Sequence, residues 1–141
     1  MINFANNLSE ISTDASPVDV LIVDDNTDAA QSLARLLTLK NHTVAIAYDG
    51  LTAITSAMQL LPAIILLDII MPPMSGYDVA KVLRAIPALN DTIIVAFTAN
   101  NSPDDRKHSI SVGINHHLVK TTPFDEVNRF ITELLRPKTS R

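Results

Sequence analysis

Residues 63–76, with the sequence AIILLDIIMPPMSG, decide the fold of this 141-residue chain. Five apolar residues, 63–67, lead directly into the carboxylate of Asp68. A short, unbroken apolar run is typical of a strand that is buried on both faces of a sheet. Pro62 before the run and Pro72 and Pro73 after it disfavour a helix through the segment. Because ligands bind at the carboxyl edge of open α/β sheets, we expect Asp68 to lie in a binding site.

The composition narrows the class of protein. The length suits one domain, and 47% hydrophobic with only 4% aromatic residues predicts an aliphatic core. The net charge of −4 argues against direct binding to nucleic acid, and the lack of cysteine excludes disulfides and thiol chemistry. The sequence has no apolar run long enough for a bilayer and no signal-peptide pattern. We therefore expect a cytoplasmic protein without membrane contact.

Apolar runs and helical patterns alternate along the chain. Besides the Asp68 strand, strands are predicted at residues 18–23, 43–48, 92–97 and 116–119. A helix is expected after each strand, and Met58, Met71 and Met74 are expected to be packing or loop residues. Five such repeats predict parallel strands, right-handed crossovers and helices on both faces. We expect the order 2-1-3-4-5, with the Asp68 strand central and the second strand at an edge.

The helix predicted to begin at Ser102 has the clearest start signal. Pro103 stands in its first turn, followed by the acids at 104 and 105. The helix is polar, and Ile110 and Val112 are its expected apolar anchors. We expect a helix with so few apolar contacts to be able to move.

The ends of the chain differ from its centre in composition. Residues 1–17 are rich in Asn and Ser and predict a flexible leader, which could serve as a linker or a short docking segment. The globular domain is expected over residues 18–136, and residues 137–141 form a polar, basic tail.

Polar residues with chemical uses follow four of the five strands. They are Asp24 and Asp25 after the first, Asp68 after the third, Thr98 after the fourth and Lys120 after the fifth. Parallel strands bring these residues to one edge, where each close carboxylate pair repels by roughly 4 kcal/mol. A hard cation such as Mg²⁺ suits oxygen ligands of this kind. The set predicts phosphoryl transfer to Asp68, with Lys120 and Thr98 holding the product.

With these motifs the sequence resembles a receiver domain of a two-component response regulator, the CheY-like form of the flavodoxin-like (βα)5 fold. The resemblance rests on LIVDDN, LLDIIMPPMSG, AFTAN and HHLVK, and it covers about residues 18–135. The segments VDDNTDAAQSLARLL and NHHLVK look most like those of receivers fused to hybrid sensor kinases, and standalone receivers share them.

The resemblance implies a phosphorelay role. Asp68 would take a phosphoryl group from a phosphohistidine on a histidine kinase or a histidine phosphotransfer protein. Asp25, Asp68 and the backbone carbonyl of Ile70 would coordinate Mg²⁺, with Asp24 acting mainly through water. The domain would phosphorylate itself and slowly hydrolyse its own phosphoryl group, so it would not be an enzyme. An apolar Ile70 is expected to shield the acyl phosphate and lengthen its life.

The resemblance also implies a switch. Phosphorylation would draw Thr98 inward and let His117 rotate. This would change the face formed by the helix from Ser102, the strand at 116–119 and the last helix, where an output partner or a second copy would bind.

Two positions depart from the family pattern. His117 stands where the family usually has an aromatic ring, and its charge would make the switch sensitive to pH. Lys120 is followed by Thr121, Thr122 and Pro123 rather than directly by proline. Either the bond after Lys120 is cis without proline, at a cost of about 3 kcal/mol, or two extra residues reroute the loop, which we favour.

Three other functions are weighed against the receiver. A pseudo-receiver would keep the fold and bind partners without phosphorylation, because the altered loop misplaces Lys120. A haloacid-dehalogenase-type phosphatase needs a second acid two residues after the nucleophile, where this chain has Ile70. A flavodoxin needs a phosphate-binding loop rich in Ser, Thr or Gly after the first strand, where this chain is acidic.

Overall fold

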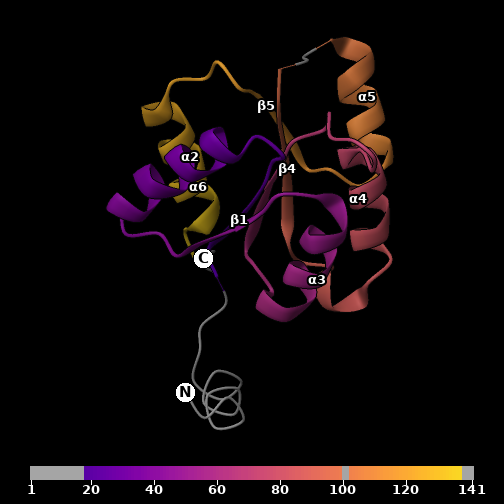
Figure 1. Ribbon diagram of the computed structural model, residues 1–141, viewed down its shortest axis with the longest axis horizontal. Helices are drawn as coiled ribbons and strands as arrows, with labels where there is room; N and C mark the ends of the chain where they lie inside the picture. Colours follow the sequence, from indigo (N-terminus) through magenta and orange to yellow (C-terminus); the bar gives the residue numbers. More distant parts are fainter. Residues whose placement is uncertain (1–17, 100–101, 138–141) are drawn as a thin grey trace, which may run out of the picture.

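The computed structural model describes residues 18–99 and 102–137, which form a parallel five-stranded sheet with helices on both faces (Figure 1). The strand order β2-β1-β3-β4-β5 confirms the predicted topology. The strands are β1 (Val20–Val23), β2 (Val44–Ala47), β3 (Ile64–Leu67), β4 (Ile93–Thr98) and β5 (His116–Val119). The helices are α2 (Thr27–Leu39), α3 (Gly50–Leu60), α4 (Gly76–Arg84), α5 (Pro103–Ser111) and α6 (Phe124–Leu135), with the 3-10 turn η1 (Pro87–Leu89).

Strand β3 is the centre of the sheet, as its unbroken apolar sequence predicts. All four of its residues are buried, and Ile64 is in register with Val20 of β1 and Ile93 of β4. Strand β2 lies at an edge, and three of its four residues are only half-buried. A strand that is covered on both faces has no solvent side that would require alternating polar residues.

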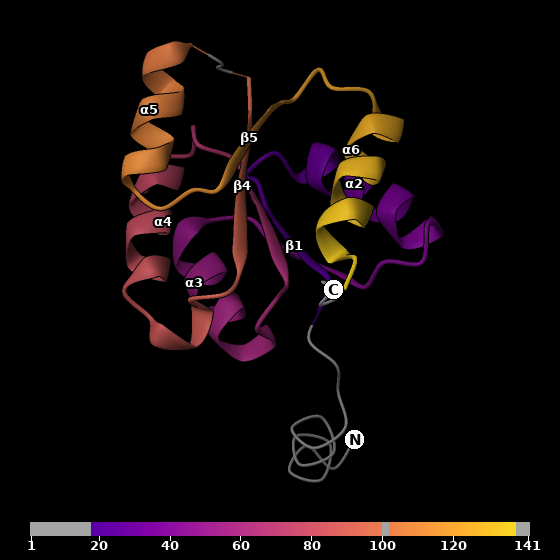
Figure 2. The same cartoon turned by 180° about the vertical axis from the view of Figure 1, so that it is seen from behind.

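The sheet separates two apolar cores. Helices α2 and α6 cover one face, and α3, α4 and α5 cover the other (Figures 1 and 2). Successive strand residues point to opposite faces, so Ile22 packs in the α2/α6 core whereas Leu21 and Val23 pack in the other. Both helix layers are thereby fixed to the same short strands.

Side-chain caps begin four of the helices. Asn26 Oδ1 accepts from Ala29 N at 3.0 Å, and Asp49 Oδ1 accepts from Thr52 N at 2.8 Å. Ser75 and Ser102 each form a capping box with the acid three residues later. The predicted start of α5 at Ser102 and Pro103 is confirmed.

Two packing predictions are wrong. Ile110 is 72% exposed, and it is Ser109 and Val112 that face the protein. These two residues are three apart and share a helix face, whereas Ile110 is turned about 100° away from Ser109. Met58 is 54% exposed, because α3 packs instead through Ala53 and Ala57.

The loop after Lys120 is rerouted, as the sequence favours. Within residues 18–99 and 102–137, the single cis peptide bond joins Pro72 and Pro73, so the bond after Lys120 is trans. Thr122 N donates to Val119 O at 3.0 Å, which turns the chain before α6 begins at Phe124.

At the edge opposite the carboxyl ends of the strands, Arg84 of α4 binds the segment that follows α5. Its Nε donates to Gly113 O at 2.9 Å, and its Nη2 donates to Asn115 Oδ1 at 2.7 Å. Burial lowers the pKa of this guanidinium from its ordinary value. None of the described helices is both long and apolar enough to cross a membrane.

Candidate functional site

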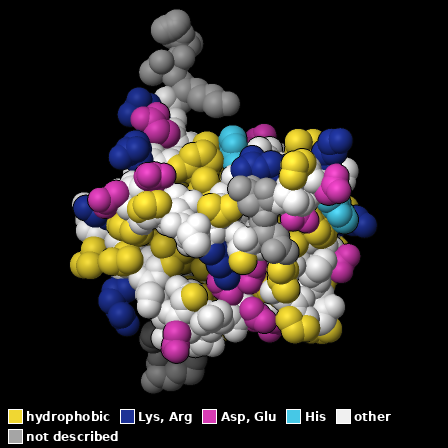
Figure 3. All heavy atoms as spheres, turned by 90° about the horizontal axis from the view of Figure 1, so that it is seen from above, with side chains coloured by type: hydrophobic (Ala, Val, Ile, Leu, Met, Phe, Trp, Pro, Cys, Tyr) yellow, Lys and Arg dark blue, Asp and Glu magenta, His cyan; other side chains and the backbone are white. Residues whose placement is uncertain are grey.

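The sheet brings the predicted polar residues to one edge. Beyond the ends of the strands, Asp24 N donates to Ala47 O at 3.1 Å and Asp68 N donates to Val23 O at 2.9 Å. The backbones of both acids are therefore held by neighbouring strands. Viewed from this edge, a dark blue basic side chain lies against a magenta acidic group near the lower centre of the face (Figure 3).

Three carboxylates form a cluster at this edge. Asp24, Asp25 and Asp68 each offer an oxygen, and these oxygens all lie within 4.8 Å of one another. Asp24 and Asp68 are buried, whereas Asp25 is exposed. The cluster thus has two fixed inner carboxylates and one that faces solvent.

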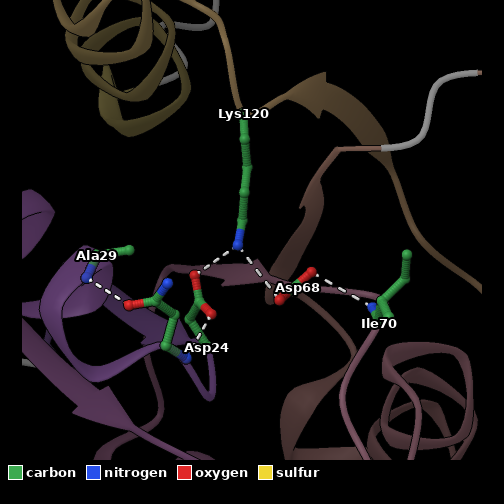
Figure 4. A network of polar contacts seen from close by, with 6 residues as sticks. Asp24, Ala29, Asp68, Ile70 and Lys120 are labelled. Atoms are coloured by element: carbon green, nitrogen blue, oxygen red, sulfur yellow. Dashed lines mark hydrogen bonds and ion pairs between the residues drawn. The ribbon is translucent and has the colours of Figure 1, made fainter.

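Lys120 extends from the end of β5 and lies between two of these acids (Figure 4). Its Nζ is 2.8 Å from Asp24 Oδ2 and 3.3 Å from Asp68 Oδ2. Burial alone would lower the pKa of Lys120, but the hydrogen bond to Asp24 and the charges of Asp68 and Asp24 outweigh burial and raise it. The ammonium is therefore charged at neutral pH.

The second oxygen of each inner acid accepts a backbone hydrogen bond. Asn26 N donates to Asp24 Oδ1 at 2.9 Å, and Ile70 N donates to Asp68 Oδ1 at 3.3 Å (Figure 4). Each carboxylate is thus oriented on one side by the backbone and on the other by Lys120.

The pKa of Asp68 is raised above its ordinary value. Burial is the largest cause, and the charge of Asp24 adds to it. The charge of Lys120 and its hydrogen bond oppose the rise without cancelling it. The ionised carboxylate of Asp68 is therefore less stable here than in water, and an added cation would favour it.

Thr98 supplies a buried hydroxyl at the end of β4. Thr98 is only 1% exposed, and its Oγ1 has no hydrogen-bond partner within the part of the chain that the structure describes. Its backbone carbonyl accepts from Lys120 N at 2.9 Å, which places it beside the lysine. A buried hydroxyl without a partner at a charged edge is suited to binding a ligand oxygen.

Gly76 is a positioning residue that sequence reasoning did not identify. It is buried at the start of α4, and its N donates to Ile69 O at 2.8 Å. A Cβ at this position would lie 2.7 Å from Ile69 Cα and closer still to the carbonyl oxygen of Asp68. The helix can thus approach the backbone of Asp68 only because residue 76 has no side chain.

The remaining predicted residues lie nearby. His117 is half-buried in β5, opposite Ala96 of β4 in the sheet register. It lines a pocket of about 270 Å³ together with Arg106, Ile110 and Phe130. The side chain of Ile70 is 56% exposed, so it faces solvent beside Asp68.

The donor set fits a hard divalent cation. The carboxylates of Asp24, Asp25 and Asp68 are oxygen ligands that lie close together, and their mutual repulsion is only partly offset by Lys120. The hydroxyl of Thr98, which has no partner among residues 18–99 and 102–137, leaves a donor for an anion beside them. Ligands of this kind are those that Mg²⁺ prefers in proteins.

The chain is similar to bacterial regulators of known sequence. It is 39% identical over 121 residues to the transcriptional regulatory protein PrrA of Mycobacterium tuberculosis, covering 86% of this chain and 51% of that protein. It is 31% identical over 119 residues to the response regulator MprA of Mycobacterium ulcerans, covering 84% and 50%. This chain therefore spans about half the length of these relatives.

Solved structures and a family model agree with this similarity. The chemotaxis protein CheY4 of Vibrio cholerae superposes with a TM-score of 0.80 at 27% identity, covering 85% of this chain and all of that one. The receiver domain of the putative response regulator NarL of Mycobacterium tuberculosis gives 0.75 at 26% identity, covering 84% and 95%. The model of the response regulator receiver domain matches residues 20–132. The chain belongs to the response regulator receiver domain family.

Proposed function

We propose that Asp68 is the phosphoacceptor of this receiver domain. The observation that carries the proposal is the contact of one ammonium, that of Lys120, with both Asp24 and Asp68 inside a cluster of three carboxylates. The pseudo-receiver hypothesis required a misplaced lysine, and Lys120 instead reaches the acceptor despite its altered loop.

The proposed step is a displacement at phosphorus. An Oδ of Asp68 forms a bond to phosphorus as the bond between phosphorus and the donor's imidazole nitrogen breaks, and that nitrogen keeps the electron pair. The ammonium of Lys120 then pairs with a phosphoryl oxygen, and the hydroxyl of Thr98 donates to another. Asp25, Asp68 and the carbonyl of Ile70 would hold Mg²⁺, with Asp24 acting mainly through water, and the ion would supply positive charge to neutralise the phosphoryl oxygens.

Partners follow from the same proposal. The donor is the phosphohistidine of a histidine kinase or of a histidine phosphotransfer protein. The face formed by α5, β5 and α6, which carries His117, binds an output partner or a second copy when Thr98 moves. Relatives about twice as long are named as transcriptional regulators, which supports a cytoplasmic setting and an output in transcription.

The experiment is phosphorylation of the whole chain by acetyl phosphate with Mg²⁺, followed by intact mass measurement. We expect the mass to increase by one phosphoryl group in the wild type and in Asp28→Asn, which changes an exposed acid on α2. Asp68→Asn should show no increase. Equal labelling of Asp68→Asn and the wild type would place the acceptor elsewhere.

The lifetime of the phosphoryl group tests the role of Ile70. We propose that its apolar side chain, beside Asp68, hinders attack by water and that the domain hydrolyses its phosphoryl group only slowly. Ile70→Ser should shorten the half-life relative to Ile110→Ser, which changes an exposed isoleucine on α5. A wild-type half-life of seconds, or no difference between the two variants, contradicts this role.

A further inference from the structure

A groove of about 390 Å³ lies at the edge of the sheet opposite the acidic cluster. Its lining is mostly apolar and comes from both helix layers: Leu61 and Pro62 after α3, Ala88 of η1, Ile93 of β4, and Leu134 and Leu135 of α6. Thr92, the buried polar residue of the lining, already donates from Oγ1 to Pro62 O at 2.9 Å. Asp91 also lines the groove, but it is exposed, so its carboxylate stays in water. The rest of the groove therefore suits apolar side chains.

The described chain begins at the rim of this groove. Ala63, which lines it, donates from its backbone N to Val18 O at 3.0 Å. In Figures 1 and 2 the start of the coloured ribbon and the end of α6 lie side by side at this edge. Whatever precedes Val18 is thus tethered next to the groove.

Residues 1–17 carry side chains of the required kind. Phe4, Leu8 and Ile11 are separated by four and three residues, a spacing that places them on one side of a helical segment. Ile11 precedes Val18 by seven residues, so the connecting chain can span about 23 Å. Apolar residues of the leader can therefore reach the groove.

We propose that residues 1–17 bind in this groove of the same chain through Phe4, Leu8 and Ile11. A tethered segment has an effective concentration in the millimolar range, which favours it over a second copy or a separate protein. The site differs from the acidic cluster and from the face that carries His117, and it does not depend on phosphorylation.

A single spin label tests the proposal, because the chain has no native cysteine. Ser9→Cys carries a nitroxide in the full chain, and the NMR amide signals of Ala63, Ile93 and Leu135 are observed. We expect these signals to broaden more than those at the carboxyl edge of the sheet. No selective broadening at the groove overturns the proposal.

Charge substitutions in the leader give a matched comparison. Leu8→Asp with Ile11→Asp should abolish the broadening. Asn6→Asp with Thr13→Asp adds the same charge on the other side of a helical segment and should leave the broadening unchanged. Equal effects of the two pairs overturn the proposal.

A groove variant and a mixing experiment complete the test. Ala88→Glu places a charge in the groove and should abolish the broadening, whereas Ala85→Glu, at an exposed alanine outside the lining, should not. A mixture of labelled chain and isotope-enriched unlabelled chain should show no broadening. Broadening in that mixture means that a second copy occupies the groove, and it overturns the proposal.

Discussion

The ammonium of Lys120 lies closer to Asp24, at 2.8 Å, than to the proposed acceptor Asp68, at 3.3 Å. Lys120, which follows β5, therefore pairs more closely with Asp24, which follows β1. A phosphoryl oxygen on Asp68 would compete with Asp24 for this ammonium. In the proposed reaction, Asp24 would hold the ammonium of Lys120 next to Asp68 before phosphorylation.

Lys120→Met should destabilise the fold by about 2 kcal/mol at pH 7, because it leaves two buried acids without their cation. Urea unfolding measures the change, and Lys81→Met, at an exposed lysine of α4, should stay near the wild type. The pKa of Lys120 is raised, so its stabilisation is complete below pH 10.5 and is lost as the pH rises through the folded-state pKa. A wild-type midpoint for Lys120→Met at pH 7 would contradict this prediction.

Asp68→Asn should be more stable than the wild type at pH 7. The pKa of Asp68 is raised by burial and by Asp24, so the folded chain binds its proton more tightly than the unfolded chain does. Wild-type stability then falls as the pH rises from 3.8 through the folded-state pKa, and the advantage of the Asn variant grows over the same range. Unfolding free energies measured from pH 3 upwards test this. Asp91→Asn, at an exposed acid, should differ little from the wild type in unfolding free energy at every pH. If the difference between Asp68→Asn and the wild type also does not change with pH, the pKa of Asp68 is not coupled to folding.

Mg²⁺ should raise the thermal midpoint of the wild type, because a ligand that binds only the folded state stabilises it by about 2.7 kcal/mol at a hundred times its Kd. Asp25→Asn removes the exposed member of the cluster without touching the contacts of Lys120. The variant should therefore need more Mg²⁺ for the same rise in scanning calorimetry. The control for charge screening by salt is Na⁺ added at equal ionic strength in Ca²⁺-free buffer. An identical rise in thermal midpoint with Mg²⁺ in both proteins would show that Asp25 does not bind the ion.

Gly76→Ala should destabilise the fold by about 2 kcal/mol, because the new Cβ would overlap the backbone of Ile69 and Asp68. It should also slow phosphorylation by acetyl phosphate, because the backbone that carries the acceptor must shift. Helix propensity alone acts in the other direction and favours alanine by about 1 kcal/mol. The sign of the change in unfolding free energy therefore decides between the two effects, and a stabilised variant would show that the close approach is unimportant.

The sequence predicts the sheet well because the patterns that identify its strands lie within short, continuous stretches of the chain. Every strand except β5, which begins with two histidines, is a short and mainly apolar run. Asp24, Asp68, Thr98 and Lys120 stand at or just after strand ends, so parallel topology alone brings them to one edge. Helix starts are equally local, as the capping box at Ser102 illustrates.

The parts that were not predicted depend on contacts across space. Helix α5 has too few apolar residues for their period to identify its inner face, so the sequence predicts Ile110 as an anchor although it is exposed. The preference of Lys120 for Asp24 depends on the reach of a flexible side chain across the sheet edge. The overlap at Gly76 depends on how closely α4 approaches the loop after β3, which no spacing along the chain records.

The backbone bond from Lys120 N to Thr98 O, 2.9 Å long, ties together the two residues proposed to hold a phosphoryl group. This bond holds the two backbones in register, so only the side chains of Thr98 and Lys120 have to adjust when a donor arrives. The ordering entropy of the two backbones is then not lost on binding. Variants that loosen this bond should weaken capture of small phosphodonors while leaving the acidic cluster intact.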